Sequence, residues 1–162
     1  MKKYLKEALI LLIVVIFASN IISWYRTKDI KSNNLELFNQ YKTINNKKVN
    51  KLLENQKPLV LNFWGTWCPV CAQEVYTIDK IAKDKDVVLI TVAVNSSNIK
   101  KYMKEKGVEF IVIDDRDGSI AKAFGVGVFP TTLFYSKDRK KIIKDSGYLS
   151  YPGYIARKKI VE

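Results

Sequence analysis

The chain of 162 residues contains two cysteines, Cys68 and Cys71, separated by two residues. Two thiols at this spacing could cycle between dithiol and disulfide, form a permanent bridge, or contribute to a metal site. The chain contains no histidine, whereas a structural zinc site takes about four ligands drawn mostly from cysteine and histidine. The same absence excludes a cysteine–histidine nucleophile, and Ala72 replaces the histidine that covalent haem attachment requires. Disulfide exchange and a structural bridge remain, and no cofactor or metal is expected.

The position of the two cysteines favours exchange. The apolar run 59–64 is typical of a strand buried on both faces, and Pro69 after Cys68 suits the first turn of a helix. Free N–H groups at a helix amino end stabilise a thiolate at Cys68, and Cys71, one turn further along, can resolve a mixed disulfide. A permanent bridge across so small a ring would stabilise little. The sequence therefore favours a redox pair over a structural disulfide.

The rest of the chain must position this pair, and its pattern is that of one α/β domain with a mixed sheet. Strands are expected over residues 40–44, 47–49, 59–64, 87–94, 110–114, 131–135 and 140–144. Helices are expected over 50–55, 69–83 and 151–161, between Ser97 and Gly107, and between Asp117 and Gly125. The order strand, helix, strand around the cysteines predicts a right-handed parallel crossover. It places them at the carboxyl end of a central strand.

The first 25 residues predict a membrane anchor. Three lysines within the first six residues precede an apolar run over 8–25 that is long enough to cross a bilayer. The run ends in Trp24 and Tyr25, an aromatic pair suited to a membrane interface, so an uncleaved anchor is favoured over a cleaved signal peptide. The lysines ahead of the span predict a single-pass protein of the cytoplasmic membrane, with its domain in the periplasm or outside the cell.

The soluble part divides into a polar linker over residues 26–39 and a domain over residues 40–162, following the anchor at 1–25. The net charge is +12. The basic residues occur in short groups interleaved with acids, which is typical of a solvated basic surface rather than a nucleic-acid groove. No nucleic-acid partner is therefore expected.

The segment from Phe63 to Cys71, with Glu74 and the later Val-Phe-Pro-Thr-Thr of residues 128–132, resembles membrane-anchored thioredoxin-fold proteins of the TlpA-like type. Within that type it is most similar to the ScsD-like and DsbE-like disulfide oxidoreductases. The resemblance covers about residues 57–147 and implies a thioredoxin fold, a central mixed sheet flanked by helices. It implies that Cys68 is the attacking thiol and Cys71 the resolving thiol, with Pro130 a cis-proline facing them.

The resemblance also suggests roles for residues near the pair. Glu74 matches an acid of the TlpA-like group and is a candidate for moving the Cys71 proton, although it could be an ordinary glutamate stabilised by the helix dipole. Asn62 stands where thioredoxin carries a buried acid. Phe129 is bulkier than usual before the proline, and either contacts substrate or packs in the core. The candidate substrate contacts are Trp67, Pro69, Val70 and Phe129.

The expected function is extracytoplasmic thiol–disulfide exchange with cysteine-containing protein substrates, served by a membrane electron donor or acceptor. The spacer Pro69-Val70 lacks the histidine of strongly oxidising relatives, which favours a reductant or exchange role. A cytochrome c maturation reductase is one alternative, although Thr131 replaces the glutamate typical of one major class. The other alternative is a membrane-tethered, non-enzymatic binding module whose cysteines form a structural disulfide and whose basic face docks an acidic partner.

Overall fold

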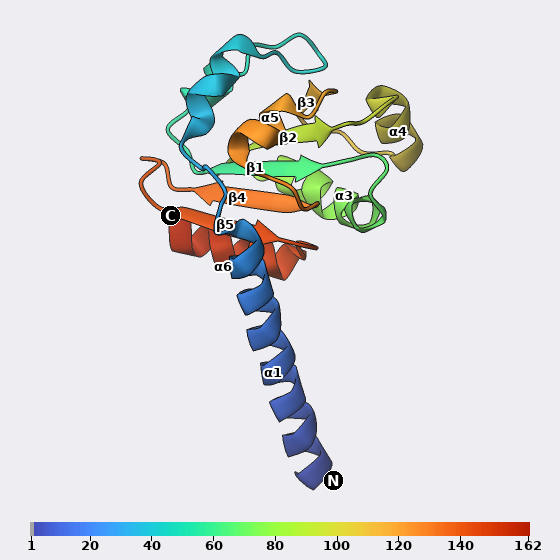
Figure 1. Ribbon diagram of the computed structural model, residues 1–162, viewed down its shortest axis with the longest axis vertical. Coiled ribbons are helices and arrows are strands. Elements are labelled where there is room, and N and C mark those ends of the chain that lie inside the picture. Colours follow the sequence, from blue (N-terminus) through green and yellow to red (C-terminus); the bar gives the residue numbers. More distant parts are fainter. Residues whose placement is uncertain (1) are drawn as a thin grey trace.

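The computed structural model describes residues 2–162 as a five-stranded sheet covered by helices, from which one long N-terminal helix extends (Figure 1). The strands are β1 (Leu59–Trp64), β2 (Val88–Val94), β3 (Val112–Asp115), β4 (Thr131–Tyr135) and β5 (Ile142–Ser146). The helices are α1 (Lys2–Thr27), the 3-10 helix η1 (Asn34–Gln40), α2 (Asn50–Leu53), α3 (Pro69–Ala82), α4 (Ile99–Lys106), α5 (Ser119–Phe124) and α6 (Tyr151–Val161).

The sheet has the order β3-β2-β1-β4-β5, with β1 at its centre. Strands β1, β2 and β3 are parallel, whereas β4 is antiparallel to both β1 and β5. Helix α3 makes the crossover from β1 to β2. The predicted mixed sheet is confirmed, and the cysteines follow the carboxyl end of the central strand, where open sheets form their sites.

Both faces of β1 are buried, which explains why its sequence is continuously apolar rather than alternating. Val60 and Trp64 belong to the core beneath α3, α4 and α6, whereas Leu61 and Phe63 belong to the core that α5 and η1 cover. Asn62 is also fully buried, and it lies between Val60 and Trp64 on their face of the strand. One strand therefore joins two apolar cores and carries a single amide into the first of them.

Two local predictions were wrong. Instead of two strands over 40–44 and 47–49, the structure has one isolated bridge between Lys42 and Lys48, closed by a turn with Asn46 at φ 61°. These segments are too short for a ladder, and Ile44 donates its N–H instead to Val112 on the sheet edge at 2.9 Å. The helix expected between Ser97 and Gly107 also starts differently from a helix capped by Ser97, because Asn98 precedes α4 in the left-handed conformation and no side chain caps the helix.

The segment predicted as a polar linker packs against the domain over much of its length. Ile30 and Phe38 are buried in the core beneath α5. Lys31 donates its N–H to the Phe124 carbonyl at 2.8 Å, and the Tyr135 hydroxyl donates to the Ser32 carbonyl at 2.9 Å. Although the segment is mostly polar, these two apolar side chains hold it against the domain. The boundaries between anchor, linker and domain stay a prediction, but this segment is no free tether.

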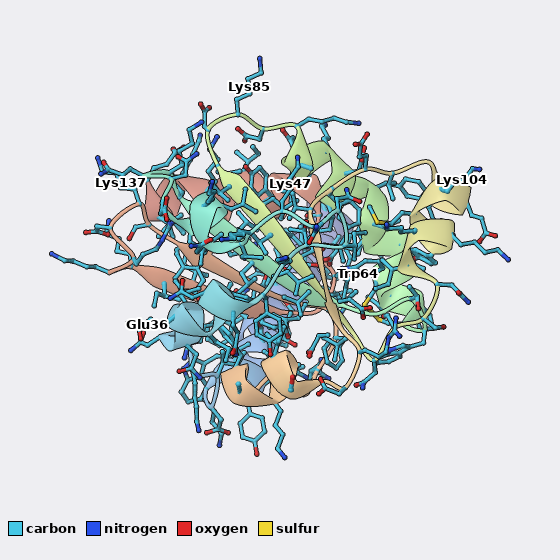
Figure 2. All side chains as sticks on the ribbon, turned by 90° about the horizontal axis from the view of Figure 1, so that it is seen from above. Glu36, Lys47, Trp64, Lys85, Lys104 and Lys137 are labelled. Atoms are coloured by element: carbon cyan, nitrogen blue, oxygen red, sulfur yellow. A yellow bond between two sulfur atoms is a disulfide. The ribbon has the colours of Figure 1, made fainter. Side chains whose placement is uncertain are left out.

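Helix α1 is long and apolar enough over Tyr4–Thr27 to cross a membrane, by length and composition, as either an anchor or a signal sequence. It leaves the domain beside β5 and α6 (Figure 1). The basic residues elsewhere are dispersed: Lys85, Lys104 and Lys137 project from different edges of the domain (Figure 2).

Candidate active site

The two cysteines form a disulfide at the amino end of α3. Cys68 is the N-cap residue, with an extended backbone, and Pro69 occupies the first turn, where its missing N–H costs no hydrogen bond. The Cys71 N–H donates to Cys68 Sγ at 3.1 Å. That donor and the helix dipole would stabilise a Cys68 thiolate after reduction. Both cysteines are nearly buried, while Pro69 and Val70 are exposed beside them.

An aromatic pair borders the disulfide. Trp67 is 54% exposed and meets Phe129 edge-to-face, with ring centroids 5.6 Å apart. The Trp67 indole donates to the Val94 carbonyl at 3.0 Å and lies against Gly65, where an added Cβ would come within 2.6 Å of the ring. Only glycine fits at position 65 with the indole in this place. The pair joins the CxxC loop to the loop before β4, so both loops form one rim.

The Phe129–Pro130 peptide bond is cis, as the resemblance implied. Cys68 Sγ lies 3.8 Å from the Phe129 carbonyl oxygen, so the proline loop faces the disulfide. The Thr131 hydroxyl donates to the Val128 carbonyl at 2.8 Å, and the Gly147 N–H donates to the Pro130 carbonyl at 2.9 Å. These bonds fix the loop between the sheet and the cysteines. Pro130 itself is buried, and Phe129 is partly buried.

Glu74 is buried beneath the disulfide and is only 1% exposed. Its Oε1 accepts from the Asn62 amide at 2.9 Å, and its Oε2 accepts from the Leu149 N–H at 2.6 Å. Burial raises the pKa of Glu74 to about 7, although both hydrogen bonds oppose the shift and the charge of Asp145 adds to it. This geometry contradicts the alternative of an ordinary glutamate in the first turn.

Asn62 links Glu74 to the sheet. Its amide also donates to the Thr132 hydroxyl on β4 at 3.0 Å, while its Oδ1 is buried without a partner. The buried amide thus comes from β1 and the buried acid from α3. Thr132 and Leu149 were not predicted as site residues. Thr132 is 70 residues from Asn62 and Leu149 is 75 residues from Glu74 along the chain, so no local sequence signal could have identified them.

Cys71 and Glu74 line the same small cavity, of about 10 Å³, together with Trp64 and Phe110. A single water needs about that volume. The cavity brings the inner thiol position and the raised-pKa carboxyl group to one enclosed space. One water in this space could connect the two groups.

Within residues 2–162 no group of three or more histidine, cysteine, aspartate or glutamate side chains is arranged to hold a metal ion. The chemistry that the arrangement itself offers is that of two sulfurs, one carboxyl group and an exposed apolar rim.

Comparisons with known proteins agree with this geometry. The sequence profile of the redoxin family matches residues 30–154. The chain belongs to the redoxin family. It is 29% identical over 159 residues to a thioredoxin-like protein of Haemophilus influenzae, covering 96% of this chain and 93% of that one. It is 34% identical over 96 residues to the thiol–disulfide oxidoreductase ResA of Bacillus thuringiensis, covering 56% of each chain.

The match to ResA thus spans about half of that relative's length. Among solved structures, DsbF of Mycobacterium tuberculosis is similar at 25% identity with a TM-score of 0.64, covering 75% of this chain and 93% of that one. The fold is therefore thioredoxin-like, as the resemblance implied. Family membership and the Cys68–Cys71 disulfide together make this redoxin-family chain a thiol–disulfide oxidoreductase.

Proposed function

We propose that this protein exchanges disulfides with cysteine-containing proteins outside the cytoplasm, in a reducing or exchanging direction, while α1 anchors it in the cytoplasmic membrane. The observation that carries the proposal is a disulfide at a helix amino end, opposite a cis-proline and above a buried carboxyl group. The sulfurs supply the chemistry without a bound cofactor.

The exposed rim supports a protein substrate. Trp67, Pro69 and Val70 present apolar surface beside Cys68, and Phe129 completes it from the opposite loop. An extended substrate segment could lie along the proline loop with its sulfur next to Cys68. We therefore assign these four residues to substrate contact, in keeping with the expectation from sequence.

In the reducing direction, the Cys68 thiolate attacks one sulfur of a substrate disulfide. The substrate's S–S bond breaks, its second sulfur leaves as a thiolate, and a mixed disulfide forms. Cys71 then loses its proton and attacks the Cys68 sulfur. The mixed disulfide breaks and the substrate leaves as a dithiol. The substrate has gained two electrons, and the Cys68–Cys71 pair has lost them and is now a disulfide. A membrane electron donor must reduce it again.

Glu74 accepts the Cys71 proton in this second step. A general base is most effective when its pKa lies near the working pH, and the pKa of Glu74 is raised to about 7 by burial. The shared cavity with Cys71 gives the route. When the Cys68–Cys71 disulfide is reduced again, the same carboxyl group returns the proton to the leaving Cys71 thiolate.

The direction of exchange rests on the spacer. Pro69 and Val70 provide no cation to stabilise the Cys68 thiolate further, and such stabilisation is what makes a disulfide strongly oxidising. We therefore assign the protein to the reducing or exchanging side.

The decisive experiment uses the Cys71→Ser variant, which retains the attacking thiol but cannot resolve a mixed disulfide. We expect it to accumulate mixed disulfides with cysteine-containing proteins, and dithiothreitol should reduce these adducts. The Cys68→Ser variant should accumulate none. Wild type should also reduce insulin. If Cys71→Ser formed no adducts and wild type left insulin oxidised, the exchange function would be wrong.

Two measurements address anchoring and direction. Alkaline carbonate extraction should leave the full-length chain in the membrane fraction. A membrane-impermeant maleimide should label the reduced cysteines in spheroplasts, whose cytoplasmic membrane is intact. Equilibration with glutathione gives the potential of the pair. A pair trapped mainly as disulfide in cells, with a potential near that of strong oxidants, would contradict the reducing direction.

A further inference from the structure

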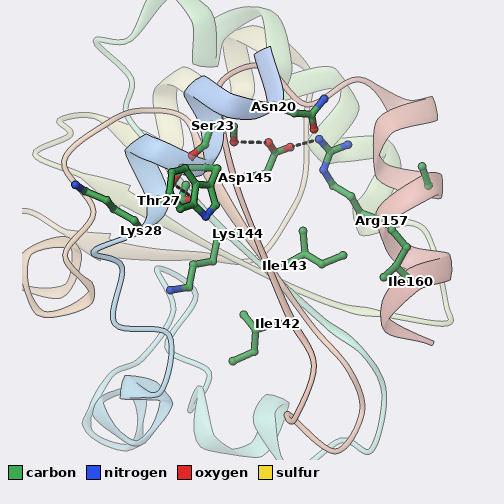
Figure 3. A pocket seen from close by; sticks show the side chains of 12 residues that line it. Asn20, Ser23, Thr27, Lys28, Ile142, Ile143, Lys144, Asp145, Arg157 and Ile160 are labelled. Carbon is green, nitrogen blue, oxygen red and sulfur yellow. Dashed lines mark hydrogen bonds and ion pairs between the residues drawn. The ribbon is translucent and has the colours of Figure 1, made fainter. Parts of the chain in front are cut away.

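The junction between α1 and the domain contains a groove that the exchange chemistry does not use. Its volume is about 670 Å³, within the range of roughly 300–1,000 Å³ typical of ligand sites. Helix α1 forms one wall and α6 the other, with β5 between them (Figure 3). The lining of the groove includes the basic residues Lys28, Lys144 and Arg157 and the apolar residues Trp24, Ile143 and Ile160.

The groove lies at the end of the apolar span. Ser23 and Trp24, from the last two turns of α1, line it together with Lys28, the residue directly after the helix. Trp24 is 68% exposed and its neighbour Tyr25 is 64% exposed. Exposed tryptophan and tyrosine at the end of a span lie at the level of the lipid headgroups. If α1 is the anchor, this groove therefore opens among the headgroups rather than into bulk water.

The charges in the groove favour an anion. Lys28, Lys144 and Arg157 contribute three positive charges, and Asp145 is the only acid among the lining residues that the structure describes. Arg157 binds Asp145 at 2.8 Å, which leaves the two lysines in excess. Lys144 uses one donor on the Ile30 carbonyl at 2.7 Å, and an ammonium group has three.

Each lysine therefore retains N–H donors for a ligand. Lys28 Nζ lies 4.5 Å from the centre of the Tyr25 ring, a contact that holds its charge near the membrane interface.

The apolar part of the lining distinguishes a lipid from a small ion. Trp24, Ile143 and Ile160 line the groove together with the charged groups, and Ile160 is 59% exposed on α6. Apolar surface beside cations fits a phosphate linked to glycerol and acyl chains. In other membrane proteins, basic pockets between transmembrane helices bind phosphate-bearing lipid headgroups.

We propose that this groove binds the phosphate-bearing headgroup of a membrane phospholipid and prefers anionic lipid, with Lys28 and Lys144 as the discriminating charges. The inference rests on the proposed anchoring of α1. An occupied groove would connect α1, β5 and α6 through one ligand. It would hold the domain, and thus the disulfide rim, in a fixed orientation to the membrane.

The test exploits the three tryptophans of the chain, Trp24, Trp64 and Trp67. Only Trp24 lines the groove, so the indole N–H resonances of the other two serve as internal controls. Full-length protein in dodecyl maltoside micelles, whose headgroup has no phosphate, is titrated with short-chain phosphatidylglycerol, short-chain phosphatidylcholine or inorganic phosphate. We expect phosphatidylglycerol to shift the Trp24 signal saturably, at lower concentration than phosphatidylcholine.

The double variant Lys28→Gln/Lys144→Gln should require about 25-fold more phosphatidylglycerol, because each of the two basic residues near a membrane surface contributes roughly a fivefold preference. The matched control Lys100→Gln/Lys104→Gln, with the same charge loss on α4, should respond as wild type. Equal shifts with both lipids, an unchanged titration of the double variant, or an equal effect of inorganic phosphate would overturn the lipid site.

Insulin reduction by the same samples separates this outcome from failure of the redox function. A mature chain lacking α1 would also overturn the site, because the groove would lose one wall.

Discussion

The carboxyl groups of Glu74 and Asp145 differ in their hydrogen-bond partners, which are neutral for Glu74 and include a cation for Asp145. Glu74 accepts hydrogen bonds from two neutral N–H groups, those of Asn62 and Leu149, and is almost completely buried. Asp145 accepts from the Ser23 hydroxyl at 3.0 Å and pairs with the Arg157 guanidinium. Thr132 pairs in register with both Asn62 and Asp145, so one strand, β4, separates the two sites.

The difference between them follows from the partners. Neutral donors only partly offset the cost of burying a charge, so Glu74 is poised to bind and release a proton near neutral pH. Asp145 instead pairs with the Arg157 guanidinium and accepts a hydrogen bond from Ser23, so it joins α1, β5 and α6. The role we propose for Glu74 is proton transfer at the disulfide, whereas Asp145 connects α1 to the sheet and to α6.

The largest expected effect concerns stability and pH. The pKa of Glu74 is raised from an ordinary value of 4.5 to about 7, so the folded chain binds this proton more tightly than the unfolded chain. The free energy of unfolding should therefore rise by about 3 kcal/mol as the pH falls from about 7 to about 4.5. Urea unfolding of the oxidised chain in micelles, followed by tryptophan fluorescence, measures this. Glu74→Gln should lose most of this rise; an equal rise in the variant would contradict it.

Glu74→Gln should also slow the resolving step by about 100-fold near neutral pH, at the lower end of general acid–base contributions. The fold should tolerate the amide, because Asn62 can rotate its unpaired Oδ1 toward the new NH₂ group. Rapid mixing of the dithiol form with a disulfide peptide measures the rate. The inflection near pH 7 should disappear in the variant, whereas Gln73→Ala, at an exposed position on the same helix, should match wild type. A retained inflection would assign the proton to another group.

Arg157→Gln should destabilise the protein by about 2 kcal/mol, because it leaves the partly buried Asp145 without its cation. For a chain of this size, that corresponds to a fall in the melting temperature of about 4–8 °C. Thermal unfolding of the full-length protein in micelles provides the measurement. Lys159→Gln, an exposed charge on the same helix, serves as control. If both variants melted alike, the ion pair would contribute nothing specific.

The smallest effect would connect the two sites. The charge of Asp145 raises the pKa of Glu74, so Asp145→Asn should lower it and move the midpoint of the resolving-step pH profile to a more acidic value. Asp86→Asn removes the same charge at an exposed side chain and should leave the midpoint unchanged. A shift toward alkaline pH in Asp145→Asn would show that its charge does not act on Glu74.

Much of the site could be predicted because its signals are local. Cys68, Pro69 and Cys71 define the redox pair within four residues, and the apolar run 59–64 gives β1 with its observed bounds. The closing helix and β4 were likewise predicted with their observed bounds. The strands expected over 40–44 and 47–49 do not form beyond one isolated bridge, because pairing there depends on the sheet edge rather than on residue preference.

The sequence by itself limited the chemistry: two cysteines without any histidine leave exchange or a structural disulfide, and their place at a helix start after a buried strand favours exchange. Only the tertiary structure decided the ionisation of Glu74, since burial and the distant donors Asn62 and Leu149 set its pKa. It also decided that residues 27–40 pack on the domain and that α1, β5 and α6 enclose a groove. Local patterns specify residue types and elements, whereas desolvation and pairing depend on groups that only folding brings together.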